Sequence, residues 1–232
     1  MEPEATRIVA IRHGETAWNR DARMQGQLDI PLNPVGRIQA QRLAQALAEE
    51  SFDAIYSSDL LRALQTAQSI AANCPREVIT EPGLRERCFG VFESLTYREV
   101  QVRWPEHARR WHERDPDFGP AGGEVLREFD ARCMQTLTRL AAAHPGQSIA
   151  IVTHGGVLDC LYRAATRVDL QATRSWDLGN ASINRLLYTP QGFTLVGWSD
   201  NSHLEGAALD DVEARGAATG TETTLPCEVS PA

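Results

Sequence analysis

The chain has 232 residues, of which 42% are hydrophobic and 23% charged, and its formal net charge is −8 at pH 7. A chain of this length can bury roughly 70% of its unfolded surface, so it needs no disulfide or metal to hold a single domain together. The acidic balance argues against a general nucleic-acid binder or a binder of anionic membranes. No apolar run approaches the ~20 residues of a membrane-spanning helix.

The scattered cysteines and the absence of lysine exclude further classes of protein. Five cysteines are scattered without a CxxC pair, which is unlike a zinc ribbon or a disulfide scaffold and suits a reducing compartment. The acidic N-terminal residues lack a signal-peptide profile, so we expect a cytoplasmic protein. All 23 basic residues are arginine, which excludes Schiff-base chemistry and a Walker-type phosphate lysine.

The first predicted strand carries a polar turn at its carboxyl end. Residues 7–11 form a short β-branched run, which is typical of a buried parallel strand. The run leads directly into Arg12-His-Gly-Glu-Thr16. Open α/β sheets hold their ligands at the carboxyl ends of strands, so this turn is a candidate site.

Strands and helices then alternate along the chain. Asn33-Pro34 has the signature of a helix start, an N-cap followed by proline at the first helical position. We predict, in chain order, a helix over 34–50, a strand at 54–56, a helix capped by 57–59 and ending near 72, a strand at 78–79, a helix over 124–143, a strand at 148–152, a helix from 157, and an antiparallel hairpin of strands 183–188 and 193–198.

Residues 96–121 interrupt this alternation with several prolines and clustered aromatic and basic side chains. We expect irregular helical turns that form a short insertion over the sheet. In one interpretation its aromatic and arginine side chains line the substrate entrance; in the other they belong to a solvated helix with aromatic core anchors. The residues concerned are Trp104, Arg109, Arg110 and Trp111.

The alternation predicts an α/β fold, a three-layer α/β/α sandwich with a mostly parallel central sheet. We expect one domain over 1–205, with the insertion at about 96–121, and a polar C-terminal tail over 206–232. The strand at 148–152 also runs into a polar glycine turn, Thr153-His-Gly-Gly156. If the two strands are neighbours, the imidazoles of His13 and His154 face one crevice.

An arginine beside a histidine at a strand end is suited to an anion site that contains a nucleophile. Guanidinium binds phosphate in a planar bidentate fork. A neutral imidazole nitrogen can attack phosphorus, provided that an acceptor holds the other ring nitrogen as N–H. Gly14 allows the backbone to approach closely.

Together the motifs resemble the histidine phosphatase superfamily, and its phosphoglycerate-mutase-like branch in particular. They occur in the family's order and span residues 7 to about 200. The motifs are Arg12-His-Gly-Glu-Thr16 with Asn19, the segment Met24 to Asn33, Ser57-Ser-Asp-Leu-Leu-Arg-Ala-Leu-Gln-Thr-Ala67, Leu84-Arg-Glu86 with Gly90, and Thr153-His-Gly-Gly156.

The resemblance implies a role for each matching position. His13 corresponds to the nucleophile that becomes phosphohistidine, and Glu86 to the general acid that protonates the leaving oxygen and later takes a proton from water. Three side chains correspond to the groups that hold the phosphoryl oxygens: Arg12, Arg62 and His154. Further substrate contacts are expected from Asn19, the Gly155 backbone, Thr16 and Gln25.

These residues would also balance the charge of a phosphate. Two arginines and a charged His154 offer up to +3 against a phosphate of roughly −2, so Mg²⁺ is not required. His107 and His112 do not share a helix face, and the sequence has no HExxH motif. We therefore predict no metal site and no cofactor.

The identity of the acid stays open at this point. Glu86 is the first candidate, although it also has Arg85 and Arg87 as neighbours with which it could simply pair. Glu93 is the rival, because it lies near the same glycine turn. Ser94 stands where phosphatase relatives more often have glycine.

The sequence favours a phosphatase that hydrolyses a small phosphate monoester through phosphohistidine. Only 67 residues separate Glu86 from His154, which leaves a short insertion and an open pocket that favours water as the acceptor. A cofactor-dependent phosphoglycerate mutase is the alternative, with Arg109-Arg110 gripping a carboxylate. A non-catalytic binder of phosphorylated ligands is a second one. The partner is a small phosphorylated substrate of unspecified identity, without nucleic acid or membrane, and a homodimer is left open beside the monomer.

Overall fold

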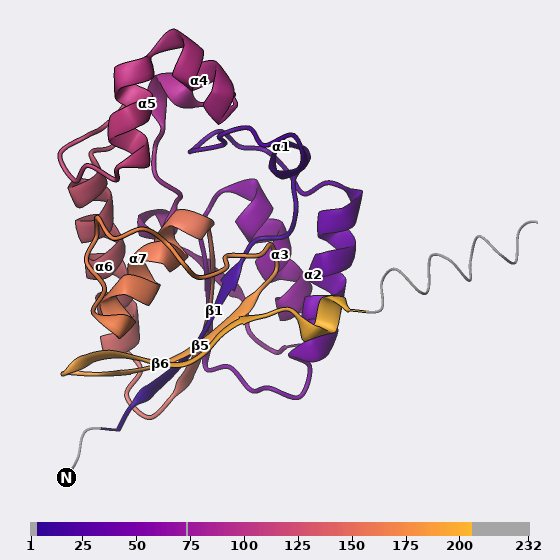
Figure 1. The fold of residues 1–232 in the computed structure, drawn as a ribbon. Coiled ribbons are helices and arrows are strands. Elements are labelled where there is room, and N and C mark those ends of the chain that lie inside the picture. Colours follow the sequence, from indigo (N-terminus) through magenta and orange to yellow (C-terminus); the bar gives the residue numbers. More distant parts are fainter. Residues whose placement is uncertain (1–3, 73, 206–232) are drawn as a thin grey trace, which may run out of the picture.

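The computed structural model describes residues 4–72 and 74–205, so the predicted polar tail at 206–232 lies outside the described residues. A single six-stranded sheet forms the centre of the molecule (Figure 1). Its strands are β1 (Thr6–Arg12), β2 (Ala54–Ser57), β3 (Val78–Thr80), β4 (Ser148–Thr153), β5 (Ile183–Thr189) and β6 (Gly192–Asp200).

The strands lie in the order β3-β2-β4-β1-β5-β6. The first four are parallel to one another, whereas β5 and β6 run antiparallel at one edge. The predicted α/β class, the mostly parallel sheet and the terminal hairpin are therefore confirmed.

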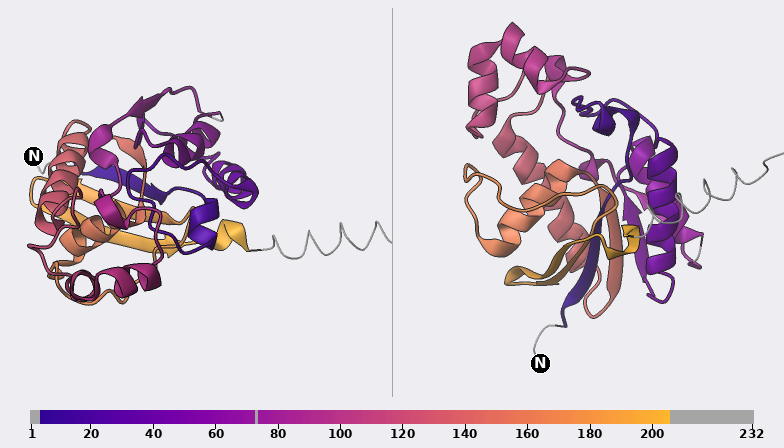
Figure 2. Two further views of the ribbon diagram at one scale, coloured as in Figure 1. Left: turned by 90° about the horizontal axis from the view of Figure 1, so that it is seen from above. Right: turned by 45° about the vertical axis from the view of Figure 1, so that its right-hand side comes forward.

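Helices cover both faces of the sheet, as Figures 1 and 2 show, and give three layers. Helices α2 and α3 pack on one face and α6 and α7 on the other. The helices are α1 (Ala17–Arg20), α2 (Pro34–Ala46), α3 (Leu61–Ala71), α4 (Tyr97–Arg103), α5 (Pro105–His112), α6 (Leu126–Ala142) and α7 (Gly155–Thr166), with 3₁₀ turns η1 (Pro82–Leu84), η2 (Gly90–Phe92) and η3 (Ser202–Leu204).

Alternation along β1 explains the two cores. Val9 and Ile11 face α2 and α3, whereas Ile8 and Ala10 face α6 and α7. A strand buried on both faces has no polar face, which is why this run is apolar throughout. All four side chains are at most 3% exposed.

Helix α2 begins where the sequence predicts and ends earlier. The Asn33 side chain accepts a hydrogen bond from the Gly36 amide at 2.7 Å and caps the helix, with Pro34 at its first position. The helix stops at Ala46 and not near Glu50, because Leu47 leaves the helical conformation and places its side chain in the core.

The insertion contains two regular helices, α4 and α5, where only irregular turns were predicted. Thr96 and Glu99 form a capping box at the start of α4, and Pro105 opens α5. Both helices lie beyond the carboxyl end of the sheet (Figure 1). They share a small core of their own with Phe92, Leu95 and Phe118.

The parallel pairing of β1 with β4 positions the site. Arg12 lies opposite Thr153 in the register of these two strands, so the residues that follow each strand emerge side by side. This is the neighbour relationship on which the predicted crevice depends. None of the helices in the described ranges has the length and apolar character needed to cross a membrane.

Candidate active site

Two histidines meet at the carboxyl end of the sheet. His13 follows β1 and His154 follows β4, and their ring centroids lie 5.2 Å apart. Both side chains are buried, with 3% and 0% exposure respectively. The geometry thus brings together two imidazoles that are 141 positions apart in the sequence (154 − 13).

His13 is held as a neutral ring with one nitrogen free. Its Nδ1 lies 2.7 Å from the carbonyl oxygen of Gly14, so Nδ1–H donates to that carbonyl and Nε2 keeps its lone pair. Burial, together with the nearby guanidiniums of Arg62 and Arg12, lowers the pKa of His13 well below 6.5. The ring is therefore neutral at pH 7, as a nitrogen nucleophile must be.

His154 is neutral as well in this ligand-free chain. Its Nε2 lies 2.8 Å from the Ser58 hydroxyl, whereas its buried Nδ1 has no partner among the described residues. Burial and the neighbouring charge of Arg62 lower the pKa of His154 well below 6.5. The expectation of a charged His154 is corrected on this point: two cations are in place before a substrate binds.

Both arginines bond backbone carbonyls and keep one buried N–H group without a partner among the described residues. Arg62, on α3, donates to the carbonyl oxygens of Gly26 at 2.8 Å and Leu28 at 2.9 Å. Arg12 donates to the Leu178 carbonyl. The Nε of each is buried and lacks a partner in the part of the chain that is described.

Burial affects the charge on Arg62 but does not remove it. The pKa of Arg62 falls to about 10, because desolvation outweighs the carboxylates around it. It stays charged at neutral pH. Each unmet buried donor costs about 1–3 kcal/mol. An oxyanion in contact with all three groups would accept from the Nε–H of Arg12 and of Arg62. It would also accept from Nδ1 of His154 in the tautomer in which the Ser58 hydroxyl donates to Nε2 and Nδ1 carries the proton.

Four further predicted residues lie around this centre in different ways. Thr16 caps the short helix α1, and the Asn19 side chain accepts from its amide and hydroxyl at 3.0 Å each. Gln25 is 7% exposed and its Oε1 is unpartnered. Gly155 opens α7, where an added Cβ would lie 3.5 Å from Arg12 Nε. Thr16 and Asn19 thus build the turn.

One supporting residue was missed by the sequence reasoning. Asn180 precedes β5 and donates to the His13 carbonyl at 3.0 Å. Asn180 lies outside every recognised motif and is 167 positions from His13 in the sequence, so no local pattern connects the two residues. Ser58, by contrast, lay inside a recognised motif, although its contact with His154 was not predicted.

The two acid candidates have separate surroundings. Glu86 lines a cavity of about 750 Å³ together with Arg12 and Gly155. Its carboxylate accepts from the amides of Arg87 at 2.8 Å and Gly156 at 3.0 Å.

Glu93 bonds backbone amides of two loops. Its Oε1 accepts from the amides of Gln27 at 3.0 Å and Phe89 at 3.1 Å and ties these loops together. Its charge acts on Arg62, where it raises the pKa of the guanidinium against the effect of burial, although it is not among the residues that line the cavity.

The outer cavity wall distinguishes the two interpretations of the insertion, and three of the four residues fit the solvated helix with a core anchor. Of the four residues considered there, Trp111 lines the cavity. Trp104 packs against Phe92. Both arginines already pair with nearby acids: Arg109 pairs with Glu106 and Glu113 at helical spacing on the exposed side of α5, and Arg110 pairs with Asp115 just beyond the helix.

Other arginines line the cavity instead of Arg109 and Arg110. Arg87 follows Glu86 and stacks over the Trp111 ring, 4.6 Å from its centroid. Arg114 and Arg174 also line the cavity. Of these, Arg114 is paired with Asp159 at 2.6 Å, whereas the hydrogen bonds of Arg87 go to backbone carbonyls.

Comparison with known proteins agrees with this geometry. The family model of the histidine phosphatase superfamily (branch 1) matches residues 8–201. Phosphoglycerate mutase-like protein 4 of Arabidopsis thaliana is 42% identical over 202 residues, covering 85% of this chain and 86% of that protein. The metal-independent phosphoserine phosphatase of the same plant is 41% identical over 212 residues, covering 90% and 87%.

Solved structures give the same answer. Bacillus stearothermophilus YhfR superposes with a TM-score of 0.81 at 31% identity, covering 86% of this chain and 100% of that one. From the motifs, the paired histidines and these matches, the chain belongs to the histidine phosphatase superfamily, branch 1.

Proposed function

We propose that the chain is a metal-independent phosphatase that hydrolyses small phosphomonoesters through a phosphohistidine on His13. The observation that carries the proposal is a set of three buried side-chain nitrogens that have no partner among the described residues, beside an oriented imidazole. They are Nε of Arg12, Nε of Arg62 and Nδ1 of His154. A relative named as a metal-independent phosphoserine phosphatase supports the same reaction.

The reaction proceeds in two steps. In the first, His13 Nε2 forms a bond to phosphorus while the bond to the leaving oxygen breaks, and Glu86 gives that oxygen its proton. In the second, Glu86 takes a proton from water as the water oxygen attacks the phosphohistidine and displaces Nε2.

Arginine supplies the positive charge in both steps. Arg12 and Arg62 hold the equatorial oxygens in place of a metal ion. The incoming dianion favours protonation of His154, which adds a third cation when the substrate is bound.

The cavity wall supports a substrate that carries a carboxylate beside its phosphate. Arg87 and Arg174 lie in its wall without a carboxylate partner in a hydrogen bond among the described residues. Such guanidiniums suit a second acidic group, as in phosphoserine. The mutase alternative draws on the relative named mutase-like, and the same two arginines would serve a phosphoglycerate. The intact catalytic set disfavours a pure binder.

Trapping of the phosphoenzyme tests the nucleophile. After a brief reaction with a ³²P-labelled monoester that is stopped in alkaline SDS, we expect alkali-stable, acid-labile label on the wild type and none on His13→Ala. Label that persists in His13→Ala would show that another residue is phosphorylated. Turnover is expected to continue in EDTA. Conversion of 3-phosphoglycerate to 2-phosphoglycerate with a trace of bisphosphate, faster than phosphate release, would establish the mutase instead.

We propose that the enzyme works in the cytoplasm. The four described cysteines are free thiols, which suits a reducing compartment. The homodimer that the sequence analysis left open stays a prediction.

A further inference from the structure

The segment that carries Glu86 lacks regular structure of its own. Residues 85–89 connect η1 to η2 without helix or strand geometry. Their backbone groups must therefore find partners among side chains or elsewhere in the fold. The position of the Glu86 carboxyl in the cavity depends on those partners.

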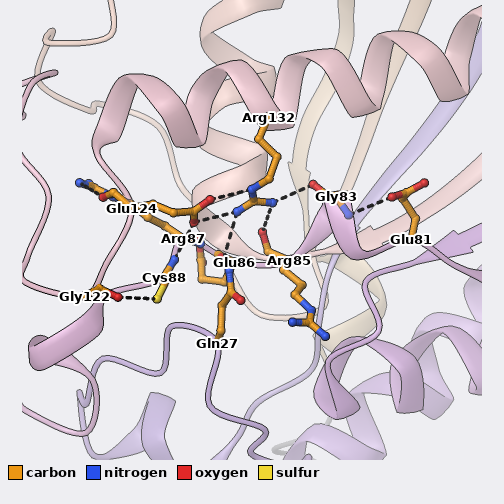
Figure 3. Close-up of polar contacts among 10 residues, drawn as sticks. All are labelled: Gln27, Glu81, Gly83, Arg85, Glu86, Arg87, Cys88, Gly122, Glu124 and Arg132. Atoms are coloured by element: carbon orange, nitrogen blue, oxygen red, sulfur yellow. Dashed lines mark hydrogen bonds and ion pairs between the residues drawn. The ribbon is translucent and has the colours of Figure 1, made fainter.

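One arginine gathers the carbonyl groups of this segment. Arg132, on α6, donates Nη1 to the carbonyl oxygens of Gly83 at 2.9 Å and Arg85 at 3.1 Å, and Nη2 to that of Glu86 at 3.4 Å. Figure 3 shows its guanidinium extending from the helix to the segment. The helix itself is fixed to the core by buried Phe129 and Cys133, so the anchor is rigid.

A carboxylate completes the anchor on the other side. The Glu124 carboxylate binds the other side of the Arg132 guanidinium. Nε donates to Oε1 at 2.7 Å and Nη2 donates to Oε2 at 2.9 Å. Its Oε2 also accepts from the Cys88 amide at 2.8 Å. The pair therefore holds the chain before and after Glu86 (Figure 3).

The hydrogen bonds of Arg132 go to backbone carbonyls and to Glu124. Neither residue is among those that line the cavity, which Glu86 does line. The bidentate contact leaves the pair without net charge, so it can fix the backbone without placing a free cation beside the acid.

We propose that Arg132 and Glu124 are positioning residues that aim the Glu86 carboxyl at the leaving oxygen. This rests on the proposed phosphatase function. A general acid has to lie within hydrogen-bond reach of the atom it protonates. A small displacement of the 85–89 segment removes Glu86 from that reach. Loss of the Arg132–Glu124 pair thus impairs proton donation by Glu86 and leaves Arg12 and Arg62 in place.

Leaving-group dependence isolates this role. Substituted phenyl phosphates with increasingly basic leaving oxygens require increasing help from an acid, and kcat/KM reports phosphoenzyme formation alone. For Arg132→Gln we expect kcat/KM to fall about 10-fold to 100-fold for phenyl phosphate and less than about 3-fold for 2,4-dinitrophenyl phosphate. Arg132→Lys, which keeps the charge but loses the fork, should fall between.

Arg139→Gln is the matched control. Arg139 lies on the same helix and pairs with Glu81, which caps η1 through the Gly83 amide, but it does not bond the carbonyls of the segment. We expect wild-type dependence on the leaving group in this variant. It loses an ion pair of α6, as Arg132→Gln does, so it separates positioning from general stability.

A double variant identifies the residue through which the Arg132–Glu124 pair acts. If Arg132 works through Glu86, Arg132→Gln adds less than about 2-fold to the loss in Glu86→Gln for phenyl phosphate. Equal losses for both leaving groups, or full multiplication of the two effects, would overturn the proposal. Should Arg132→Gln not fold, Arg132→Lys decides by the same comparison. A wild type that hydrolyses none of these esters would instead refute the phosphatase function.

Discussion

The Glu86 carboxylate rests directly on the backbone of Gly156. The Gly156 amide donates to Oε2 at 3.0 Å, and a Cβ atom on Gly156 would lie only 2.1 Å from Oε1. A side chain at position 156 would therefore have to displace the acid. This close approach explains the second glycine of the Thr153-His-Gly-Gly156 turn, where the helix start alone would accept other residues.

Gly156→Ala is expected to fold and to lose activity. The atom that must move furthest is the tip of the flexible Glu86 side chain, while Cζ of Phe129 at 3.1 Å has to give by a few tenths of an ångström, so we expect the free energy of unfolding to fall by about 1 kcal/mol. Turnover of an alkyl phosphate should fall about 10-fold or more, because the acid is moved. Steady-state kinetics and urea unfolding measure both. Gly197→Ala is the control, since its Cβ would meet nothing within 4 Å.

Glutamine at the two candidate acids should separate their roles. Glu86→Gln removes the donated proton, so we expect alkyl phosphate turnover to fall about 10²-fold to 10⁴-fold while inorganic phosphate still binds. Glu93→Gln keeps an oxygen for the amides of Gln27 and Phe89 and should keep most activity. Progress curves and phosphate titration by calorimetry give the comparison. Full activity in Glu86→Gln with loss in Glu93→Gln would reverse the assignment.

Stability is expected to fall as the pH drops below 6.5. The folded chain holds His13 and His154 with lowered pKa values, so in that range the unfolded chain binds protons that the native chain refuses. The stabilising contribution is full above pH 6.5 and is lost as the pH falls toward the folded values.

The size of this loss can be checked. Each histidine contributes a slope of up to about 1.4 kcal/mol per pH unit. Urea unfolding between pH 7.5 and 5.5 measures the slope, and His13→Ala should reduce it. A free energy of unfolding that is flat over this range in the wild type would contradict neutral, buried imidazoles.

Sequence reasoning could single out His13 and His154 because both lie in compact motifs at strand ends. The run before Arg12 and the one before Thr153 are apolar and short, and their carboxyl ends must meet if the strands pair in parallel. The order of strands, and hence the 5.2 Å between the rings of His13 and His154, depended on pairing that local patterns do not encode.

Contacts between distant segments were beyond the same reasoning. Arg109 and Arg110 form a conspicuous basic pair, but local acids neutralise them. Arg87 and Arg174 had no such signal and nevertheless line the cavity. Which arginine is left without a partner depends on side-chain packing in the insertion, where the sequence predicted only irregular turns.

Arg174 should therefore discriminate between substrates by their second acidic group. Its exposed side chain lies in the cavity wall and makes no ion pair with any residue of the described ranges. For Arg174→Ala we expect KM for phosphoserine to rise about 5-fold or more, the loss of one charge-assisted contact, whereas KM for p-nitrophenyl phosphate changes less than about 2-fold. Arg109→Ala is the matched control and should leave both values unchanged, because Glu106 and Glu113 hold that guanidinium away from the cavity. A rise in KM for the two substrates alike would mean that Arg174 acts on the phosphate that they share. No rise in KM for either substrate would mean that the carboxylate binds elsewhere in the cavity wall, and Arg87 would be the next residue to substitute.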